Sequence, residues 1–186
     1  MKVNSIVSVL SVIMHLEFDL EIDMKKVKSG VSPIDAALKF LTPKARTIRE
    51  IEDYLDDCQY SEYDVYATVE RLKELGYADD LRYAHDFIDS RLATKPVSKQ
   101  KLREQLISHS VSRDIINEAL ANITPETEYA NALATAKKYF HQLSDLPHDE
   151  RVRRTVKRLV SHGYDYSDAK LCMEELCDER IDDELE

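Results

Sequence analysis

Apolar residues recur at helical spacing along most of this chain. From residue 33 onward they return every three or four positions, which is the period of an amphipathic helix. Helix start signals precede these stretches. Ser32 stands before Pro33, which suits a first helical turn, and Thr47 and Glu50 have the spacing of a capping box. The chain beyond residue 32 is therefore predicted to be helical.

The helical pattern repeats after about fifty residues. Three cap-type residues, Ser61, Ser112 and Asp165, lie 51 and 53 residues apart. An apolar residue follows each of them after four, eight and eleven positions, on one stripe of a helix. The nine stripe positions are Val65, Val69, Leu72, Ile116, Leu120, Ile123, Ala169, Met173 and Leu176.

A second set of positions divides each unit into three helices. Thr47 and Ser98 stand fourteen residues before Ser61 and Ser112 and can cap a preceding helix, whereas Arg151 holds this place in the third unit and leaves its boundary open. We predict an all-α protein of three tandem three-helix repeats that form an elongated curved array. The predicted segments are an N-terminal extension (1–32), the repeats (33–78, 79–126 and 127–180) and an acidic tail (181–186).

The extension follows a different pattern from the repeats. Apolar and acidic residues alternate over 16–23, which is the period of a strand, and 5–14 fits either a strand or a buried helix. A small β-hairpin is one expectation, and a start at Met24 is the alternative. Acidic residues follow the apolar stretch in place of a small-residue cleavage site, so secretion is not expected.

Composition narrows the class of protein. Only three glycines are present, so neither GxGxxG nor GxxxxGK[ST] can be written, and nucleotide chemistry of those kinds is not expected. No apolar run reaches 18 residues, so we expect no membrane span. The odd cysteine count (Cys58, Cys172 and Cys177) indicates reduced thiols in a cytoplasmic protein, and no metal site or cofactor is expected.

Charge is unevenly distributed along the chain. The net charge is −10, and residues 165–186 carry −8 of it, with ten acidic and two basic side chains, so the remaining residues carry −2. An acidic end of this kind is usually solvated, although it can also compete for a basic partner surface. The rest of the chain is nearly neutral, and this charge is compatible with an anionic partner.

Two neighbouring acids, Asp79 and Asp80, stand out beside Gly76. They lie between a predicted helix end at Gly76 and the next apolar face, where an aspartate caps a helix and complements its dipole. No base, nucleophile or set of metal ligands converges on them in sequence. Capping is therefore preferred over catalysis.

Two stretches carry a resemblance to a known family. GYADDLRYAHDFIDSR (76–91), followed by VSKQKLREQLISHSVSRDIINEAL (97–120), resembles the RecX family of bacterial recombination regulators. The family motif is a glycine, an aromatic residue, any residue, two aspartates and an aromatic–alanine pair that opens a helix. Its positions here are Gly76, Tyr77, Asp79, Asp80, Tyr83 and Ala84. A third stretch, RLVSHGYDYSDA (158–169), resembles the closing segment of the family.

The resemblance implies a non-enzymatic regulator of the RecA recombinase. Members of this family bind along the groove of the RecA filament on single-stranded DNA and generally inhibit its activities, in DNA repair, recombination and the SOS response. The family is built of tandem three-helix repeats, which agrees with the periodicity. No cofactor and no small-molecule substrate are implied, and a weak direct contact with DNA stays open.

Basic residues cluster near the predicted start of the second helix of each repeat. Cations there are unfavourable by roughly 0.3–1 kcal/mol each, so their recurrence indicates an anionic partner. In the first repeat (Lys44, Arg46 and Arg49), a solvated face is the better interpretation. The partner-binding candidates are Lys99, Lys101 and Arg103 in the second repeat and Arg151, Arg153, Arg154, Lys157 and Arg158 in the third.

Histidines and aromatic residues near these clusters are expected to be structural. Tyr83 and Phe87 fall on the predicted core stripe, so they should pack in the core and not stack on bases. His109 and His162 hold matched repeat positions and are interpreted as partners for carbonyls at helix ends.

Three other functions are alternatives to regulation of RecA. A helical-repeat adaptor unrelated to recombination would ignore RecA and single-stranded DNA. A direct DNA-binding protein would show a steep salt dependence without RecA. An enzyme is disfavoured, because no phosphate loop, nucleophile elbow or zinc spacing is present.

Overall fold

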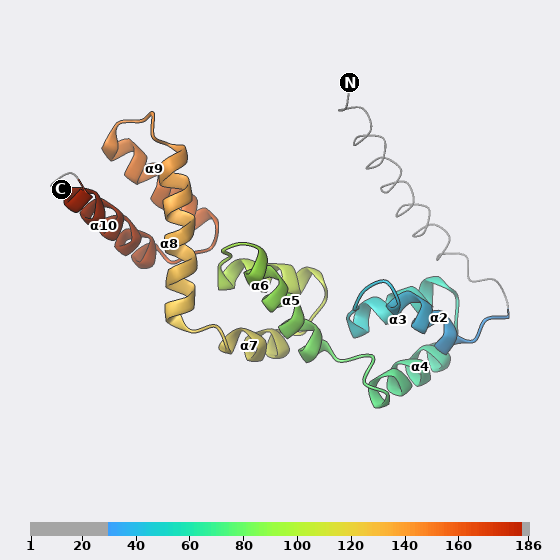
Figure 1. Cartoon of the computed structure of the whole chain (residues 1–186). Coiled ribbons are helices and arrows are strands. Elements are labelled where there is room, and N and C mark those ends of the chain that lie inside the picture. Colours follow the sequence, from blue (N-terminus) through green and yellow to red (C-terminus); the bar gives the residue numbers. More distant parts are fainter. Residues whose placement is uncertain (1–29, 184–186) are drawn as a thin grey trace, which may run out of the picture. The chain divides into compact units, whose positions relative to one another are not determined.

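The computed structural model describes residues 30–183, with side chains described up to Cys177. This part of the chain is all-helical, so the predicted fold class is confirmed (Figure 1). The predicted β-hairpin lies outside the described residues. In order, the helices are α2 (Pro33–Leu41), α3 (Ile48–Asp57), α4 (Glu62–Glu74), α5 (Asp80–Thr94), α6 (Lys99–Ser108), α7 (Arg113–Ala121), α8 (Pro125–Gln142), α9 (His148–Ser161) and α10 (Tyr166–Asp183).

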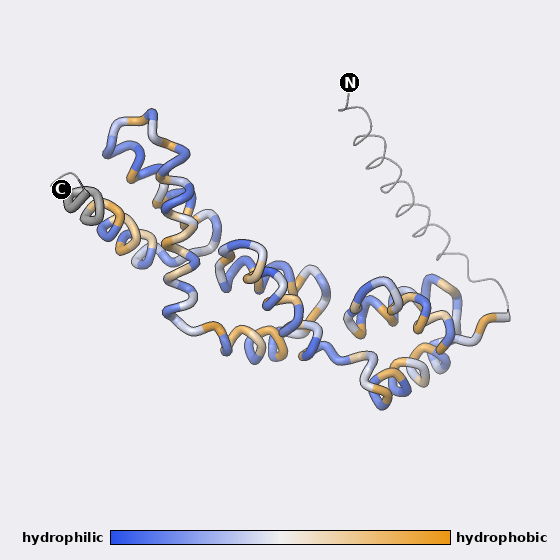
Figure 2. Tube along the Cα trace, viewed as in Figure 1, coloured by the Kyte–Doolittle hydropathy of each residue, from blue (hydrophilic) through white to orange (hydrophobic). Residues whose placement is uncertain are grey.

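Three successive groups of three helices each enclose a hydrophobic core. The groups are α2–α4, α5–α7 and α8–α10, and each predicted stripe lies in the core of its own group. Leu72 is fully buried, Ile123 is 5% exposed and Leu176 is 7% exposed. The threefold recurrence of apolar positions is thereby confirmed as a recurrence of cores. In Figure 2, hydrophobic and hydrophilic residues follow one another along each helix, as amphipathic helices require.

Side-chain caps start the helices where the sequence predicts them. Thr47 and Glu50 form a reciprocal capping box, and the hydroxyls of Ser32, Ser98 and others accept backbone N–H groups of the first turn. At α10, the Asp165 carboxylate accepts the backbone N–H of Ser167 at 2.8 Å. Each such cap stabilises a helix by about 1 kcal/mol. The short helices of the repeats therefore have defined ends before any packing is counted.

Gly76 ends α4 in a left-handed conformation, as predicted, with a φ of 72°. The backbone N–H of Tyr77 bonds the Leu72 carbonyl at 2.9 Å and that of Gly76 bonds the Lys73 carbonyl at 3.0 Å. This is the hydrogen-bond pattern of a Schellman motif. The same turn closes the second helix of each repeat, where positive φ angles fall at Gln59, Ser110 and Gly163.

The chain divides into two compact units, with the boundary between Asp79 and Asp80. The first contains α2–α4 and the second contains α5–α10. Two helix ends differ from the sequence-based segments: α8 begins at Pro125, before the predicted boundary at 127, and α10 continues to Asp183, into the predicted tail. Both helices have 18 residues, so the third repeat is larger than its sequence spacing suggests.

Two kinds of feature are absent from the described residues. Within 30–183, no helix is both long enough and apolar enough to cross a membrane. In the same region, no three His, Cys, Asp or Glu residues are grouped so that they could hold a metal ion.

Candidate partner-binding surfaces

The basic residues of the third repeat lie on α9, but they do not form one surface. Successive residues on a helix point about 100° apart, so five cations within eight positions spread around the axis. The structure gives them three different surroundings: the core, a groove beside α10, and the side of α9 nearer α8. The cluster predicted from the sequence must therefore be divided.

Arg151 is a correction to the predicted site, because its side chain is only 7% exposed. Its Nε donates a hydrogen bond to the Phe140 carbonyl at 2.5 Å, and its guanidinium lies 3.6 Å from the centre of the Phe140 ring. α9 begins at His148, one turn before Arg151, with no side-chain cap. Arg151 thus faces inward, and its guanidinium stabilises the third repeat and does not face a partner.

Arg153 and Lys157 line a groove between α9 and α10 with a volume of about 1030 Å³. The same helix face carries Val152, Val156 and Val160, at the i, i+4 spacing that aligns side chains on one side. From α10 the groove is lined by Tyr166, Lys170, Met173, Glu174 and Cys177. This groove combines apolar side chains with exposed cations, a combination that the sequence pattern did not predict.

Arg154 and Arg158 lie elsewhere on α9 and make contacts of their own. Arg154 forms an ion pair with Glu150 at 2.5 Å, with more than half of its side chain exposed. The Arg158 guanidinium lies 5.2 Å from the centre of the Tyr139 ring of α8. Both charges stay accessible, on the side of α9 away from the groove residues.

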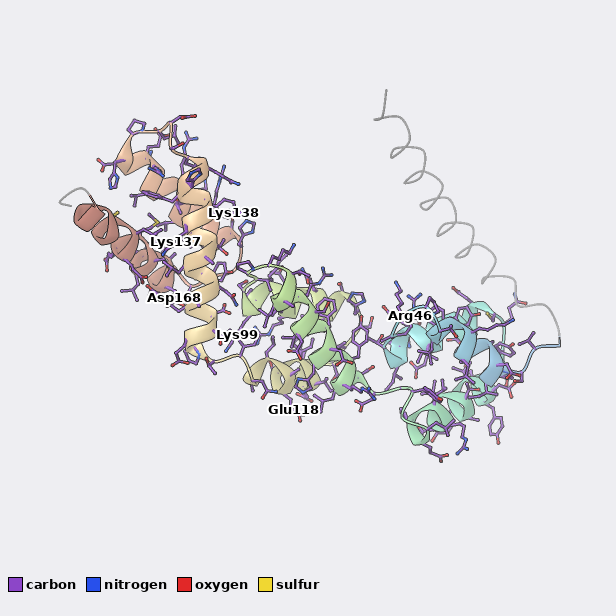
Figure 3. All side chains as sticks on the ribbon, viewed as in Figure 1. Arg46, Lys99, Glu118, Lys137, Lys138 and Asp168 are labelled. Carbon is purple, nitrogen blue, oxygen red and sulfur yellow. The ribbon has the colours of Figure 1, made fainter. Side chains whose placement is uncertain are left out.

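The candidate cations of the second repeat lie on α6. Lys101 forms an ion pair with Glu104 at 2.9 Å, and Arg103 makes long hydrogen bonds, of 3.4 Å, to Gln100 and Asn117. Lys99, labelled in Figure 3, is the first residue of α6. Its backbone N–H donates to both carboxylate oxygens of Glu128 on α8, at 3.0 and 3.1 Å. The start of α6 is thus held by a carboxylate from the third repeat.

A second contact joins the same two repeats. The Ser98 hydroxyl caps α6 and also donates to the His162 carbonyl at 2.6 Å. A Cβ atom at the neighbouring Gly163 would lie 2.9 Å from both the Ser98 Oγ and the Gln100 Cβ. Burial raises the pKa of the Glu128 carboxyl, and the Lys99 N–H opposes that shift. We call this contact of α6 with the end of α9 and with α8 the repeat 2–3 joint.

The glycine–aspartate motif has a structural position. Gly76 and Tyr77 close α4, Asp79 directly precedes α5, and Asp80 is the first residue of α5. Ala84 is fully buried in the core of the second repeat. Capping of α5 by Asp79 stays a prediction. Tyr83 and Phe87 pack against the same core, as expected.

The two matched histidines lie at helix ends and bond carbonyls there, as predicted, but through the backbone N–H. Each is the C-cap residue of its helix. The rings contact aromatic side chains: His109 lies edge-on to Tyr83 and Phe87, and His162 stacks on Tyr139 and hydrogen-bonds its hydroxyl. The matched positions reflect repeated helix ends, where an aromatic neighbour holds the ring.

The described thiols form no disulfide with one another and differ in exposure. Cys172 is fully buried, and burial raises the pKa of its thiol to about 11. Cys177 is half-buried in the lining of the α9–α10 groove, with its Sγ 3.7 Å from the His148 Nε2. Cys177 is therefore the thiol that reports on this groove.

Comparison with known proteins gives concordant matches. The sequence profile described as "RecX, second three-helix domain" matches residues 79–120. A "Regulatory protein RecX" of Chlorobium phaeobacteroides is 33% identical over 131 residues, which cover 70% of this chain and 84% of that protein. Its counterpart in Lactobacillus gasseri is 28% identical over 166 residues, which cover 89% of this chain.

The matches also concern length and fold. This chain spans 55–61% of the length of the lactobacillus relatives from L. gasseri and L. delbrueckii. A crystal structure of RecX from Lactobacillus salivarius superposes with a TM-score of 0.73 at 21% identity, covering 77% of this chain and 94% of that one. At this identity the superposition demonstrates a shared fold.

Proposed function

This chain belongs to the RecX family of regulatory proteins, and from that membership we propose that it binds the RecA filament on single-stranded DNA and inhibits it. Regulation of this kind needs a binding surface and no reaction chemistry. The proposal places the protein in DNA repair, recombination and the SOS response, in the cytoplasm.

The observation that carries the proposal is the family match over the motif-bearing second repeat, residues 79–120. Unit 2 adds surfaces suited to an anionic partner. Arg153, Lys157 and Lys170 line one groove, and no ion pair links them to a carboxylate among the described residues. Exposed cations without local partners favour association with acidic protein surface or with phosphates.

A sedimentation assay tests the proposed partner. The full chain is mixed with RecA filament on single-stranded DNA, with RecA alone, and with the DNA alone. We expect the chain to sediment with the filament and to stay in the supernatant with DNA alone. Equal recovery with naked DNA, falling steeply with salt, would replace the proposal by direct DNA binding. No recovery with any of the three would remove RecA as the partner and leave an unrelated adaptor.

A further inference from the structure

The α9–α10 groove has the construction of a site for a helix. Val152, Val156 and Met173 contribute apolar side chains along its length, and all three also pack on the core of the third repeat. Its volume of about 1030 Å³ lies at the upper limit of the roughly 300–1,000 Å³ typical of small-ligand pockets. An open apolar groove between two helices fits the mode in which an amphipathic helix packs its apolar face into a partner.

The longer helices of the third repeat supply residues at the far end of the groove. α9 has 14 residues, whereas α3 and α6 have 10 each. The extra turn at the start of α9 brings His148 and Asp149 into the lining. The 18-residue α10 extends along it and brings Cys177 opposite His148.

Charge along the groove is polarised. α9 and α10 are joined by residues 162–165, and Lys157 and Lys170 lie toward this turn, together with Val160 and Tyr166. Asp149 and Glu174 lie toward the other end, where Cys177 approaches His148. A helix that fits must therefore carry acidic residues at the end near the α9–α10 turn.

The turn end also has the most exposed apolar side chains of the lining. Val160 is 44% exposed and Tyr166 is 62% exposed, and no carboxylate of the described residues forms an ion pair with Lys157 or Lys170. Apolar area and unpaired cations at one place give both parts of a binding contact: burial supplies affinity, and complementary charge supplies orientation and association rate.

We infer that the α9–α10 groove receives an amphipathic helical segment of the regulated protein, with carboxylates at the end that meets Lys157 and Lys170. This inference rests on the proposed function, because the RecA filament is the partner that would present the segment. The apolar stripe of the segment packs on Val152, Val156 and Val160. Arg153 lies midway along the groove and meets a further carboxylate.

Two substitutions of matched exposure test the groove in the full chain. Val160→Glu places an acid at the turn end of the groove, whereas Leu171→Glu places one at a 50% exposed position of α10 outside the lining. We expect Val160→Glu to raise the Kd for the filament at least about tenfold, or about 1.4 kcal/mol, and Leu171→Glu to change it less than about twofold. Equal Kd values for both variants would overturn the inference.

Thiol alkylation gives a second readout that needs no substitution. Cys177 lies in the groove, Cys58 lies in the first repeat, and Cys172 is buried. Filament binding is expected to slow iodoacetamide modification of Cys177 at least about fivefold while Cys58 reacts at an unchanged rate. Peptide mass spectrometry assigns the modified thiol.

These experiments distinguish a failure of the groove inference from a failure of the proposed function. Filament binding without protection of Cys177 would reject the groove and leave the proposed function intact. Absence of filament binding would reject both. Protection of Cys177 by naked single-stranded DNA would assign the groove to nucleic acid and overturn the protein-helix inference.

Discussion

Arg151 takes the place that Thr47 and Ser98 hold in the other two repeats, and all three side chains are buried. The two smaller residues cap a helix from this place. Arginine cannot accept a backbone N–H, since its guanidinium has only donors. Its guanidinium instead bonds the Phe140 carbonyl and lies over the Phe140 ring, which anchors α9 to the end of α8.

Removal of this anchor should destabilise the third repeat. A desolvated cation–π contact contributes about 2 kcal/mol and a charged hydrogen bond about 1.5–3 kcal/mol. Contacts made by one guanidinium do not add fully, so we expect Arg151→Ala to lower the free energy of unfolding by roughly 2–4 kcal/mol. Arg154→Ala, at an exposed ion pair, should change it by less than about 1 kcal/mol. Urea unfolding followed by circular dichroism provides the comparison. Equal losses for the two variants would contradict the anchoring role.

Residue-level prediction succeeds where local chemistry decides the outcome. The capping box at Thr47 and the left-handed turn at Gly76 depend on neighbours in sequence, and the structure confirms both. The burial of Arg151 depends on the carbonyl of a residue on another helix, and periodicity does not encode such a partner. The histidine rings escape prediction for the same reason, because their aromatic neighbours come from other helices.

At the scale of elements, the repeat 2–3 joint depends on close approach at Gly163. The position has a positive φ in every repeat, but Gln59 and Ser110 occupy it in the first two, so the turn itself does not require glycine. Any other residue at position 163 would bring its Cβ to 2.9 Å from Ser98 and Gln100, and this close contact explains why glycine is needed there. Glycine here allows α6 to reach the end of α9.

Two glycine variants distinguish the backbone cost of the left-handed turn from the cost of crowding at the repeat 2–3 joint. Gly76 has a φ of 72° with nothing within 4 Å of a Cβ, so Gly76→Ala should cost roughly 1–2 kcal/mol for its backbone alone. Gly163→Ala should cost roughly 1–3 kcal/mol more, because overpacking adds to the backbone term. Amide exchange in the first turn of α6 should accelerate in Gly163→Ala and not in Gly76→Ala. Equal stabilities of the two variants, with unchanged amide exchange in α6, would mean that the repeat 2–3 joint accommodates the added methyl group without strain.

The sequence predicts the helices and their buried sides better than it predicts the contacts between repeats and the exposed surfaces. The stripe positions indicate which sides turn inward, because burial of apolar area is the dominant favourable term in folding. The joint connects Ser98 to a carbonyl 64 residues away, and no local pattern marks that pairing. The groove has a local signal, since Val152, Val156 and Val160 recur four apart, but no cap residue in the sequence marks the start of α9 that completes it.

At the scale of the whole molecule, unit 2 holds both the motif-matched second repeat and the α9–α10 groove. We therefore expect the proposed regulator to bind mainly through unit 2. The sequence can predict the three repeats and the RecX resemblance, since both depend on residues at recurring or motif positions. It cannot divide the α9 cations among surfaces, because that division depends on which helices pack on either side of α9.

Charge reversal on different faces of unit 2 tests that division. Arg153→Glu with Lys157→Glu alters the groove, Arg154→Glu with Arg158→Glu alters the opposite side of α9, and Arg82→Glu with Arg113→Glu changes the net charge equally in the second repeat. We expect only the groove pair to weaken filament binding strongly, by at least about tenfold, with a reduced salt dependence. A loss confined to the Arg154 and Arg158 pair would move the site to that side of α9.

The proposed inhibition of RecA is measured most directly by its ATP hydrolysis on single-stranded DNA, titrated with the full chain and with the three charge-reversed pairs. We expect the unaltered chain and the Arg82/Arg113 pair to inhibit hydrolysis at similar concentrations, while the groove pair needs at least about ten times more. Hydrolysis that stays unchanged at saturating amounts of the unaltered chain would contradict the proposed inhibition of RecA.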